Sequence, residues 1–294
     1  MQSQALYYKE SGAISASAIA STLALGLVAA ALLGFIYGIV TYFIPFIYLN
    51  AILAFFFGLG LGLALAMVAR WTKIRNRAAF IAISTVVGLG GVYFAWVAWI
   101  YAITEFEMLL WNPREILEIQ QLIMMTGAWE IFGQTMQGMP LMLVWLIEAV
   151  LIAGNTVRTA VQGMGRTPFC ESCERWTEET ILRDGLFPVY NADDLRRELE
   201  QEQLTELDRL AASQPSGNSF TRLELAKCAT CINASYLTVS KVTLERKDDD
   251  IEETVTILID NLKISNGFQQ ELLEWANKHN ADPPAGFHFN SPVA

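Results

Sequence analysis

Charged side chains are absent from long stretches of the first half of the chain. No Asp, Glu, Lys or Arg occurs in the 59 residues from 11 to 69 or in residues 78–104, and Glu148 alone interrupts a third run, 131–157. A helix needs roughly 20 apolar residues to cross the ~30 Å hydrocarbon core of a bilayer. The absence of charge therefore excludes an ordinary soluble protein and predicts one that is embedded in a membrane.

The first uncharged run is long enough for two spans, because Pro45 and Asn50 lie near its middle, where a turn is needed. Together with the two later runs, it predicts an all-α membrane domain, a bundle of four transmembrane helices. We place the spans at about residues 18–41, 47–69, 79–103 and 138–156. With their connecting segments they make up a first domain, residues 1–157, in contact with the lipid bilayer.

Basic residues are scarce in this domain, and most of them lie in one short segment. Four lie within residues 70–77, between the second and third spans, whereas the segment 105–137 has one, Arg114, against several glutamates. Short loops rich in Lys and Arg stay in the cytoplasm. We therefore expect residues 105–137 outside the cell and both termini in the cytosol, in a bacterial inner (plasma) membrane.

The external segment is expected to contain an amphipathic helix. Asn112 and Pro113 are typical of a helix start, as the N-cap and the first helical residue. A helix that lies at a membrane surface has one apolar and one polar side. The residues that follow have this pattern: Ile116, Leu117, Ile119, Leu122 and Ile123 with Glu115, Glu118, Gln120 and Gln121.

Small residues recur at every fourth position in the first two spans. They are Gly26, Ala30, Gly34 and Gly38 in the first, and Gly58, Gly62 and Ala66 in the second, with Gly60 and Ala64 on an adjacent row. Helices in lipid associate through such faces, because close approach of the backbones supplies the packing. Two interpretations stay open: packing within one chain, and a seam between copies of the chain in a homo-oligomer.

Glu148 lies near the centre of the fourth span. A carboxylate in hydrocarbon is costly and usually faces the interior of a bundle. The four spans contain no Lys, Arg or His to pair with it. We expect it to be protonated or bonded to a hydroxyl of the third span, such as that of Ser84, Thr85 or Tyr93. It is either a structural acid that joins helices or part of a proton or cation pathway.

Histidine and cysteine are rare, and all of them lie in the second half of the chain. From Arg158 onward there are 14 basic and 23 acidic residues, a net charge of −9. A nucleic acid would be expected to bind a basic face. The acidic balance therefore argues against a nucleic-acid partner for this part, which we expect to be a cytosolic domain.

The four cysteines form two C-x-x-C pairs, Cys170 with Cys173 and Cys228 with Cys231. Two such pairs supply four thiolates for one tetrahedral Zn²⁺. The part of the chain from about 167 to 265 resembles a zinc ribbon in this module alone. The resemblance implies one structural zinc ion without an open coordination site. A redox dithiol and two disulfides are the alternatives, both disfavoured in the cytosol.

The pairs are separated by 54 residues, so the module must carry an insertion. We expect the second domain, 158–280, to be α+β. Its elements are a charged helical insertion over 191–212, two strands over 236–245 and 254–264 with period-two alternation, and a last helix that ends near residue 280. Residues 281–294 are expected to form a flexible tail.

No phosphate-binding glycine loop, nucleophile elbow or HExxH motif occurs in the chain, which argues against an enzyme. We expect a membrane-anchored, homo-oligomeric adaptor or sensor whose zinc-stabilised cytosolic domain contacts a cytosolic protein partner. The alternative is a small channel or transporter that uses the intramembrane carboxylate Glu148.

Overall fold

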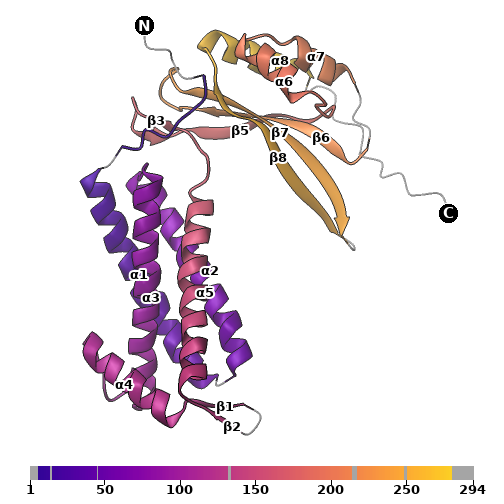
Figure 1. The fold of residues 1–294 in the computed structure, drawn as a ribbon. Helices are drawn as coiled ribbons and strands as arrows, with labels where there is room; N and C mark the ends of the chain where they lie inside the picture. The colour runs from indigo at the N-terminus through magenta and orange to yellow at the C-terminus, as the bar shows by residue number, and fades with distance from the viewer. Residues whose placement is uncertain are drawn as a thin grey trace, which may run out of the picture. The chain divides into compact units, whose positions relative to one another are not determined.

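The structure, a computed structural model, describes residues 6–13, 15–44, 46–131, 134–213, 217–247 and 250–279 (Figure 1). Contacts divide the chain into two compact units. One consists of residues 11–165, and the other of residues 166–294 together with the N-terminal residues 1–10. The predicted domain boundary after residue 157 stays a prediction; by contacts, the N-terminal residues group with the second unit.

The first unit is built on four helices that are long and apolar enough to cross a membrane, as predicted. They are α1 (Ala16–Phe43), α2 (Ile47–Thr72), α3 (Arg77–Ile103) and α5 (Met139–Gly163). Most extend a few residues beyond the predicted spans, because they continue to residues that can cap them. The side chains of Ser15 and Asn76 accept backbone N–H groups at the starts of α1 and α3, and Lys73 ends α2 in a left-handed conformation with φ 56°.

The small residues predicted to line α1 and α2 pack within the chain. Those of α1 face α3, where a Cβ added at Gly38 would lie 2.3 Å from the carbonyl oxygen of Ala95. Those of α2 face α5, where a Cβ at Gly58 would lie 2.6 Å from the carbonyl oxygen of Ile152. Backbone-to-backbone approach of this kind is possible only without side chains. Both rows of small residues therefore pack against helices of the same chain.

Between α3 and α5 the chain forms the helix α4 (Pro113–Thr126) and a short hairpin of β1 (Trp129–Ile131) and β2 (Gln134–Met136). The side chain of Asn112 caps α4 by accepting the N–H of Arg114 at 3.0 Å, and Pro113 is its first residue. The helix start is therefore where the sequence predicted it. The hairpin has no alternating pattern long enough to predict it.

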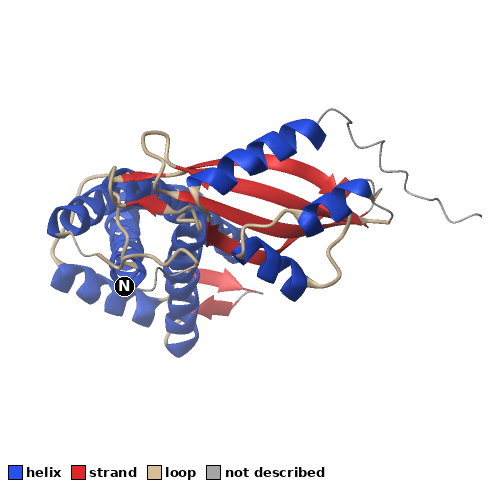
Figure 2. Ribbon diagram, turned by 90° about the horizontal axis from the view of Figure 1, so that it is seen from above, coloured by secondary structure: helices blue, strands red, loops and turns tan. Residues whose placement is uncertain are grey.

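The second unit contains a four-stranded antiparallel sheet in the order β5-β6-β7-β8. Its strands are β5 (Glu178–Leu186), β6 (Ser219–Lys227), β7 (Ser235–Lys247) and β8 (Asp250–Lys263). Three helices, α6 (Ala192–Glu200), α7 (Thr205–Ala212) and α8 (Asn266–His279), lie across one face of the sheet (Figure 2). Leucines of β6 and β7 meet Leu195, Leu207 and Leu272 of the helices in the core between them.

Three predictions for this unit need correction or lie outside the described residues. The insertion 191–212 is two helices and not one, because Gln201 ends α6 and Glu202 has a positive φ of 56°. The sheet also has two strands that were not predicted, β5 and β6, which flank the insertion. The tail 281–294 lies outside the part of the chain that the structure describes.

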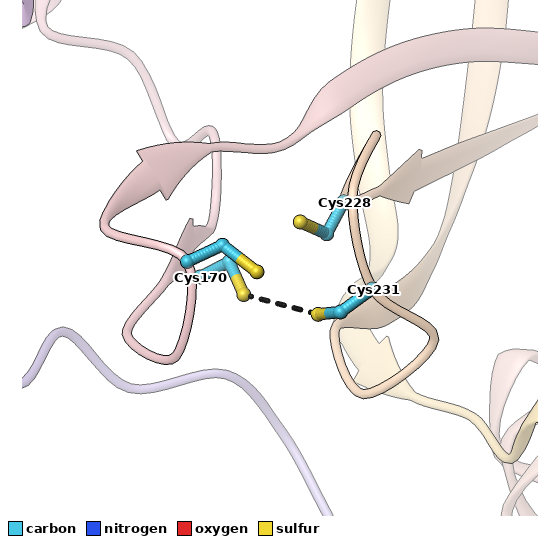
Figure 3. Close-up of side chains that lie close together, drawn as sticks. Cys170, Cys228 and Cys231 are labelled. Atoms are coloured by element: carbon cyan, nitrogen blue, oxygen red, sulfur yellow. Dashed lines mark hydrogen bonds between the residues drawn. The ribbon is translucent and has the colours of Figure 1, made fainter.

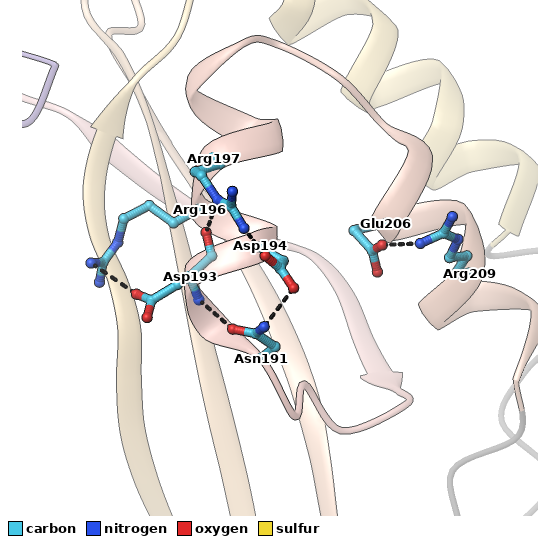
Figure 4. Close-up of polar contacts among 7 residues, drawn as sticks. All are labelled: Asn191, Asp193, Asp194, Arg196, Arg197, Glu206 and Arg209. Carbon is cyan, nitrogen blue, oxygen red and sulfur yellow. Dashed lines mark hydrogen bonds and ion pairs between the residues drawn. The ribbon is translucent and has the colours of Figure 1, made fainter.

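Charged side chains of the insertion pair with one another along α6 and α7 (Figure 4). Within α6, Arg197 pairs with Asp194, and within α7, Arg209 pairs with Glu206. Asn191 caps α6 by accepting the N–H of Asp193 at 3.2 Å. Pairs three residues apart on one helix contribute only about 0.2–0.5 kcal/mol each. The insertion is therefore held mainly by its buried leucines.

We predict that Gly38→Ala lowers the melting temperature of the protein in detergent. The added Cβ would collide with the α3 backbone at Ala95, and such overpacking costs about 1–3 kcal/mol. Gly154→Ala is the matched control, because a Cβ there would meet nothing within 4 Å. The control should melt at or above the wild-type temperature, since Ala is the better helix former. Equal melting of the two variants would contradict the packing described for α1 and α3.

Candidate metal centre

The four cysteines lie in two turns that the fold brings together. The first turn joins β3 (Phe169–Cys170) to β4 (Arg175–Trp176), and the second joins β6 to β7. Cys170 ends β3, and Cys228 follows β6 directly, so that pairing of the strands fixes the start of each turn. The second turn is closed by the N–H of Cys228, which donates to the carbonyl of Ala234 at 2.9 Å.

All four sulfur atoms lie within 4.8 Å of one another, and all four cysteines are free thiols. Cys170 Sγ and Cys231 Sγ, from different turns, are 3.5 Å apart (Figure 3). Cys170 and Cys228 are buried, and the other two are half-buried. The structure thus brings together the four residues that the sequence singled out, in an arrangement that could hold one metal ion.

The turns set different proton affinities for the thiols. Burial raises the pKa of Cys170, and hydrogen bonding to the Cys231 sulfur, with burial, raises the pKa of Cys173 to about 12. Burial also acts to raise the pKa of Cys228, but the backbone N–H groups of Thr230 and Cys231 outweigh it and lower that pKa to about 6. At neutral pH the metal-free site therefore holds a thiolate at Cys228 and protonated thiols at Cys170 and Cys173.

An N-terminal segment lies directly beside this centre. Residues 6–8 pair with the edge of β8: Tyr7 forms a bridge with Leu262, and the N–H of Lys263 donates to the carbonyl of Leu6 at 2.8 Å. The ring of Tyr8 packs edge-on against Tyr236 at 5.3 Å, within the cluster that contains Cys170 and Cys228. The first residues of the chain that the structure describes therefore form part of the wall of the centre.

The side chains of Tyr7 and Tyr8 hold this segment at two further points. The hydroxyl of Tyr8 accepts the N–H of Phe169, one residue before Cys170, at 3.1 Å. The hydroxyl of Tyr7 donates to Glu200 of α6 at 2.6 Å. Burial and this bond to Glu200 raise the pKa of Tyr7 to about 12, so the hydroxyl keeps its proton at physiological pH.

Asn261 of β8 binds the N-terminal segment and the segment after α5 at the same time. Its carbonyl accepts the N–H of Tyr8 at 2.9 Å, and its side-chain amide donates to the carbonyl of Arg166 at 3.1 Å. Asn261 lies in a β-bulge, where it and Asp260 stand opposite Thr238, and its φ is 51°. Asn tolerates this left-handed conformation better than most residues.

Sequence reasoning did not single out Tyr7, Tyr8 or Asn261. Asp260 and Asn261 are a polar pair inside an otherwise apolar strand, and such a pair can mark a bulge. The two tyrosines before the first span are a weaker signal, because an isolated aromatic pair next to Lys9 and Glu10 has no period to place it.

Glu148, the other predicted site residue, lies in the first unit, whereas the four cysteines lie in the second. Its Oε1 accepts the hydroxyl of Tyr37 in α1 at 2.5 Å. The partners expected in the third span are wrong, because their hydroxyls donate to backbone carbonyls: Ser84 to Phe80, Thr85 to Ile81 and Tyr93 to Trp111. Ser and Thr in helices commonly bond to the preceding turn in this way.

Comparison with protein-family models, with curated proteins and with solved structures finds no match for the chain.

We predict that the full-length protein, purified in detergent, binds about one metal ion per chain. Cys173→Ser or Cys228→Ser should abolish this binding and destabilise the second unit, because a structural metal site contributes free energy of folding. Ser172→Ala is the control: Ser172 is an exposed residue of the first turn and not one of the four clustered residues. Metal analysis of a stable, metal-free wild-type protein would contradict the assignment of a metal centre.

We also predict that metal binding releases protons. Since Cys170 and Cys173 have raised pKa values, each must lose a proton to become a ligand at neutral pH. At least two protons should therefore leave per ion, and the affinity should fall as the pH is lowered. Titration of the metal-free protein in weak buffer with a pH indicator measures this. An affinity that does not change between pH 6 and pH 8 would show that the thiols are not the ligands.

Proposed function

We propose that the protein is a membrane-anchored sensor or adaptor whose zinc-stabilised domain governs the two segments that join it to the transmembrane helices. The observation that carries this proposal is the pair of bonds at Asn261, to Tyr8 before α1 and to Arg166 after α5. Since Tyr8 also packs beside the cysteines, the state of the centre can act on both segments.

Zinc is the metal that the ligand set favours. Tetrahedral zinc with Zn–S bonds of about 2.3 Å needs sulfur–sulfur distances of about 3.8 Å. The sulfur atoms lie within 4.8 Å of one another, with Cys170 and Cys231 3.5 Å apart, so small side-chain movements would complete the site. Two strand-connected turns that each supply two cysteines give the centre a zinc-ribbon-like form. Four protein ligands leave no position for a substrate, so the zinc would be structural.

The second unit is proposed to lie in the cytosol. Residues 6–10 and 166–279 belong to one unit, and four helices separate them, so an even number of crossings returns the chain to the side on which it began. The basic segment 70–77 between α2 and α3 then lies on that same side, which the positive-inside rule makes cytoplasmic. We propose a bacterial inner (plasma) membrane as the location.

Self-association of the helices is a further part of the proposal. Gly38, Gly58 and Gly62 are in close contact with neighbouring helices of the same chain, so they are not free to contact a second copy. The adjacent row with Gly60 and Ala64 is different, because a Cβ at Gly60 would meet nothing within 4 Å. We propose that a homo-oligomer uses this row of α2.

A cytosolic protein partner is proposed to bind at the helical insertion. A groove of about 310 Å³ lies between residues 187–191 and the helices α6 and α7. At its rim the side chain of Tyr190 is 86% exposed, and the charged pairs of α6 and α7 lie close by. An exposed aromatic side chain beside a charged rim is typical of protein interfaces.

A small channel or transporter is the second candidate, and one observation favours it. Glu148 borders a cavity inside the helix bundle, and its one hydrogen bond among the described residues is to Tyr37. Carboxylates buried among transmembrane helices are costly and usually mark a functional site. A transporter would move a cation or proton in a manner that Glu148→Gln changes, whereas a sensor without this activity would carry no flux in liposomes.

Hydrogen exchange of the Tyr8 amide tests the leading proposal. This N–H is bonded to Asn261 and should be protected in the zinc-loaded full-length protein. Removal of zinc with a chelator should speed its exchange by about tenfold or more, because local opening then becomes easier. The variant Tyr7→Ala, which removes the side-chain bond to Glu200 that holds this segment, should show faster exchange even with zinc bound, while Tyr190→Ala should behave as wild type. Exchange at Tyr8 that is the same with and without zinc would separate the centre from the membrane segments and contradict the proposal.

A further inference from the structure

The helix bundle contains a cavity whose walls combine acid, amide and indole groups. The space open to the centre of a water-sized molecule is about 50 Å³. The cavity lies among α1, α2, α3 and α5, near the end where α1 leads to α2. The side chains that matter for its chemistry are Tyr37, Asn50, Trp96, Trp99, Trp145 and Glu148.

One buried polar group of the cavity is an acceptor that lacks a donor among the described residues. Asn50 is only 8% exposed, and its Oδ1 has no hydrogen-bond partner among the residues that the structure describes. Glu148 receives one hydrogen bond, from the hydroxyl of Tyr37 at 2.5 Å. Because that hydroxyl is used as a donor, it cannot satisfy Asn50 as well. A buried acceptor without a donor is costly, so Asn50 Oδ1 indicates a ligand that donates hydrogen bonds.

The chain supplies no cation to this carboxylate. The six basic residues between positions 11 and 165 are Arg70, Lys73, Arg75, Arg77, Arg114 and Arg158. None of them is among the described residues that line the cavity. A carboxylate in a low-dielectric site is stabilised by a positive partner, and the described residues that line this cavity do not supply one.

Three tryptophans form the remaining walls. The ring centres of Trp96 and Trp145 are 4.9 Å apart at an interplanar angle of 88°, and those of Trp96 and Trp99 are 5.7 Å apart at 76°. Rings at such angles surround a space with both faces and edges. The faces of indole rings attract cations, ammonium groups included.

We propose that this cavity binds a small organic ammonium ion. Its N–H groups would donate to Glu148 and to Asn50 Oδ1, while its methyl or ethyl group contacts the indoles. The volume holds roughly four water-sized molecules at about 10–15 Å³ each, which suits an ion of two to four heavy atoms. A hard metal ion such as calcium takes 6–8 oxygen ligands, and the apolar indole walls do not offer them.

The ligand would enter from the outer side under the proposed orientation. Thr41 near the end of α1, Asn50 near the start of α2 and Ala128 after α4 all line the cavity. These residues belong to the end of the bundle away from the basic segment 70–77. Binding at this site does not depend on the metal centre. The proposal of a binding site holds both for a ligand that is carried across the membrane and for one that is only sensed.

Titration of the full-length protein in detergent micelles with ethylammonium tests the proposal. Calorimetry and tryptophan fluorescence should both show saturable binding, because three tryptophans line the site. Glu148→Gln, which keeps an acceptor for Tyr37 but removes the charge, should weaken binding by about tenfold or more. Trp145→Leu should also weaken it. Glu118→Gln changes an exposed glutamate of α4 and should have no effect.

Two further ligands separate the alternatives. Ethanol has the same number of heavy atoms as ethylammonium but no charge, and sodium has the charge but no N–H or alkyl group. Either of them binding as tightly as ethylammonium would overturn the proposal, as would a wild-type protein without saturable ethylammonium binding. Unchanged affinity in Glu148→Gln would do the same. If Glu148→Gln does not assemble, the same criteria apply to Trp145→Leu.

Discussion

The bonds made by Asn261 are the constraint on which the arrangement of the second unit depends. This residue, in a bulge of β8, accepts the N–H of Tyr8 and donates to the carbonyl of Arg166. The strand is therefore hydrogen-bonded both to the segment before α1 and to the segment after α5. The bulge makes this possible, because it frees backbone and side-chain groups of β8 from the regular ladder with β7. Tyr8 also packs against the cysteine cluster, so the four cysteines, the edge of β8 and the N-terminal segment form one connected set of contacts.

The first unit is held together by a different principle. Its helices approach through glycines, with carbonyl oxygens and side-chain atoms at the distances where a Cβ would collide. Packing of this kind leaves little room for polar groups, and the cavity beside Glu148 is therefore an exception that has to be explained. A structural acid explains the bond to Tyr37. It does not explain the three indoles around the same space, or the amide oxygen of Asn50, which has no partner within the described part of the chain.

The elements with a strong pattern were predictable from the sequence. The three uncharged runs predicted four long helices, the Asn112-Pro113 pair predicted the start of α4, and the two C-x-x-C pairs predicted a cluster of four thiols. What failed depends on contacts between residues distant in the chain. The partner of Glu148 comes from α1 and not from α3, because helix order in a bundle is not encoded by the pattern of any one span.

The strands β5 and β6 show the same limit in the second unit. They lie on either side of a helical insertion, and β6 pairs with β7 along nine positions, from Ser219 with Thr243 to Lys227 with Ser235. Their alternation is short and contains charged residues such as Arg183 and Glu224. The pairing of Tyr7 with Leu262 joins residues from opposite ends of the chain, which no local pattern can predict.

The central claim is that metal binding at the four cysteines and the docking of residues 6–8 against β8 stabilise each other. Zinc affinity tests this claim most directly. Coupling between two sites is reciprocal. If zinc favours docking of the N-terminal segment by some factor, loss of that docking must weaken the affinity for zinc by the same factor. Tyr7→Ala removes the bond to Glu200 and the packing of the Tyr7 ring against the core of the second unit, without touching a cysteine. The account predicts that the full-length Tyr7→Ala protein binds zinc about fivefold or more weakly than wild type, while Tyr190→Ala binds it equally well. Equal zinc affinity in Tyr7→Ala and wild type would contradict it.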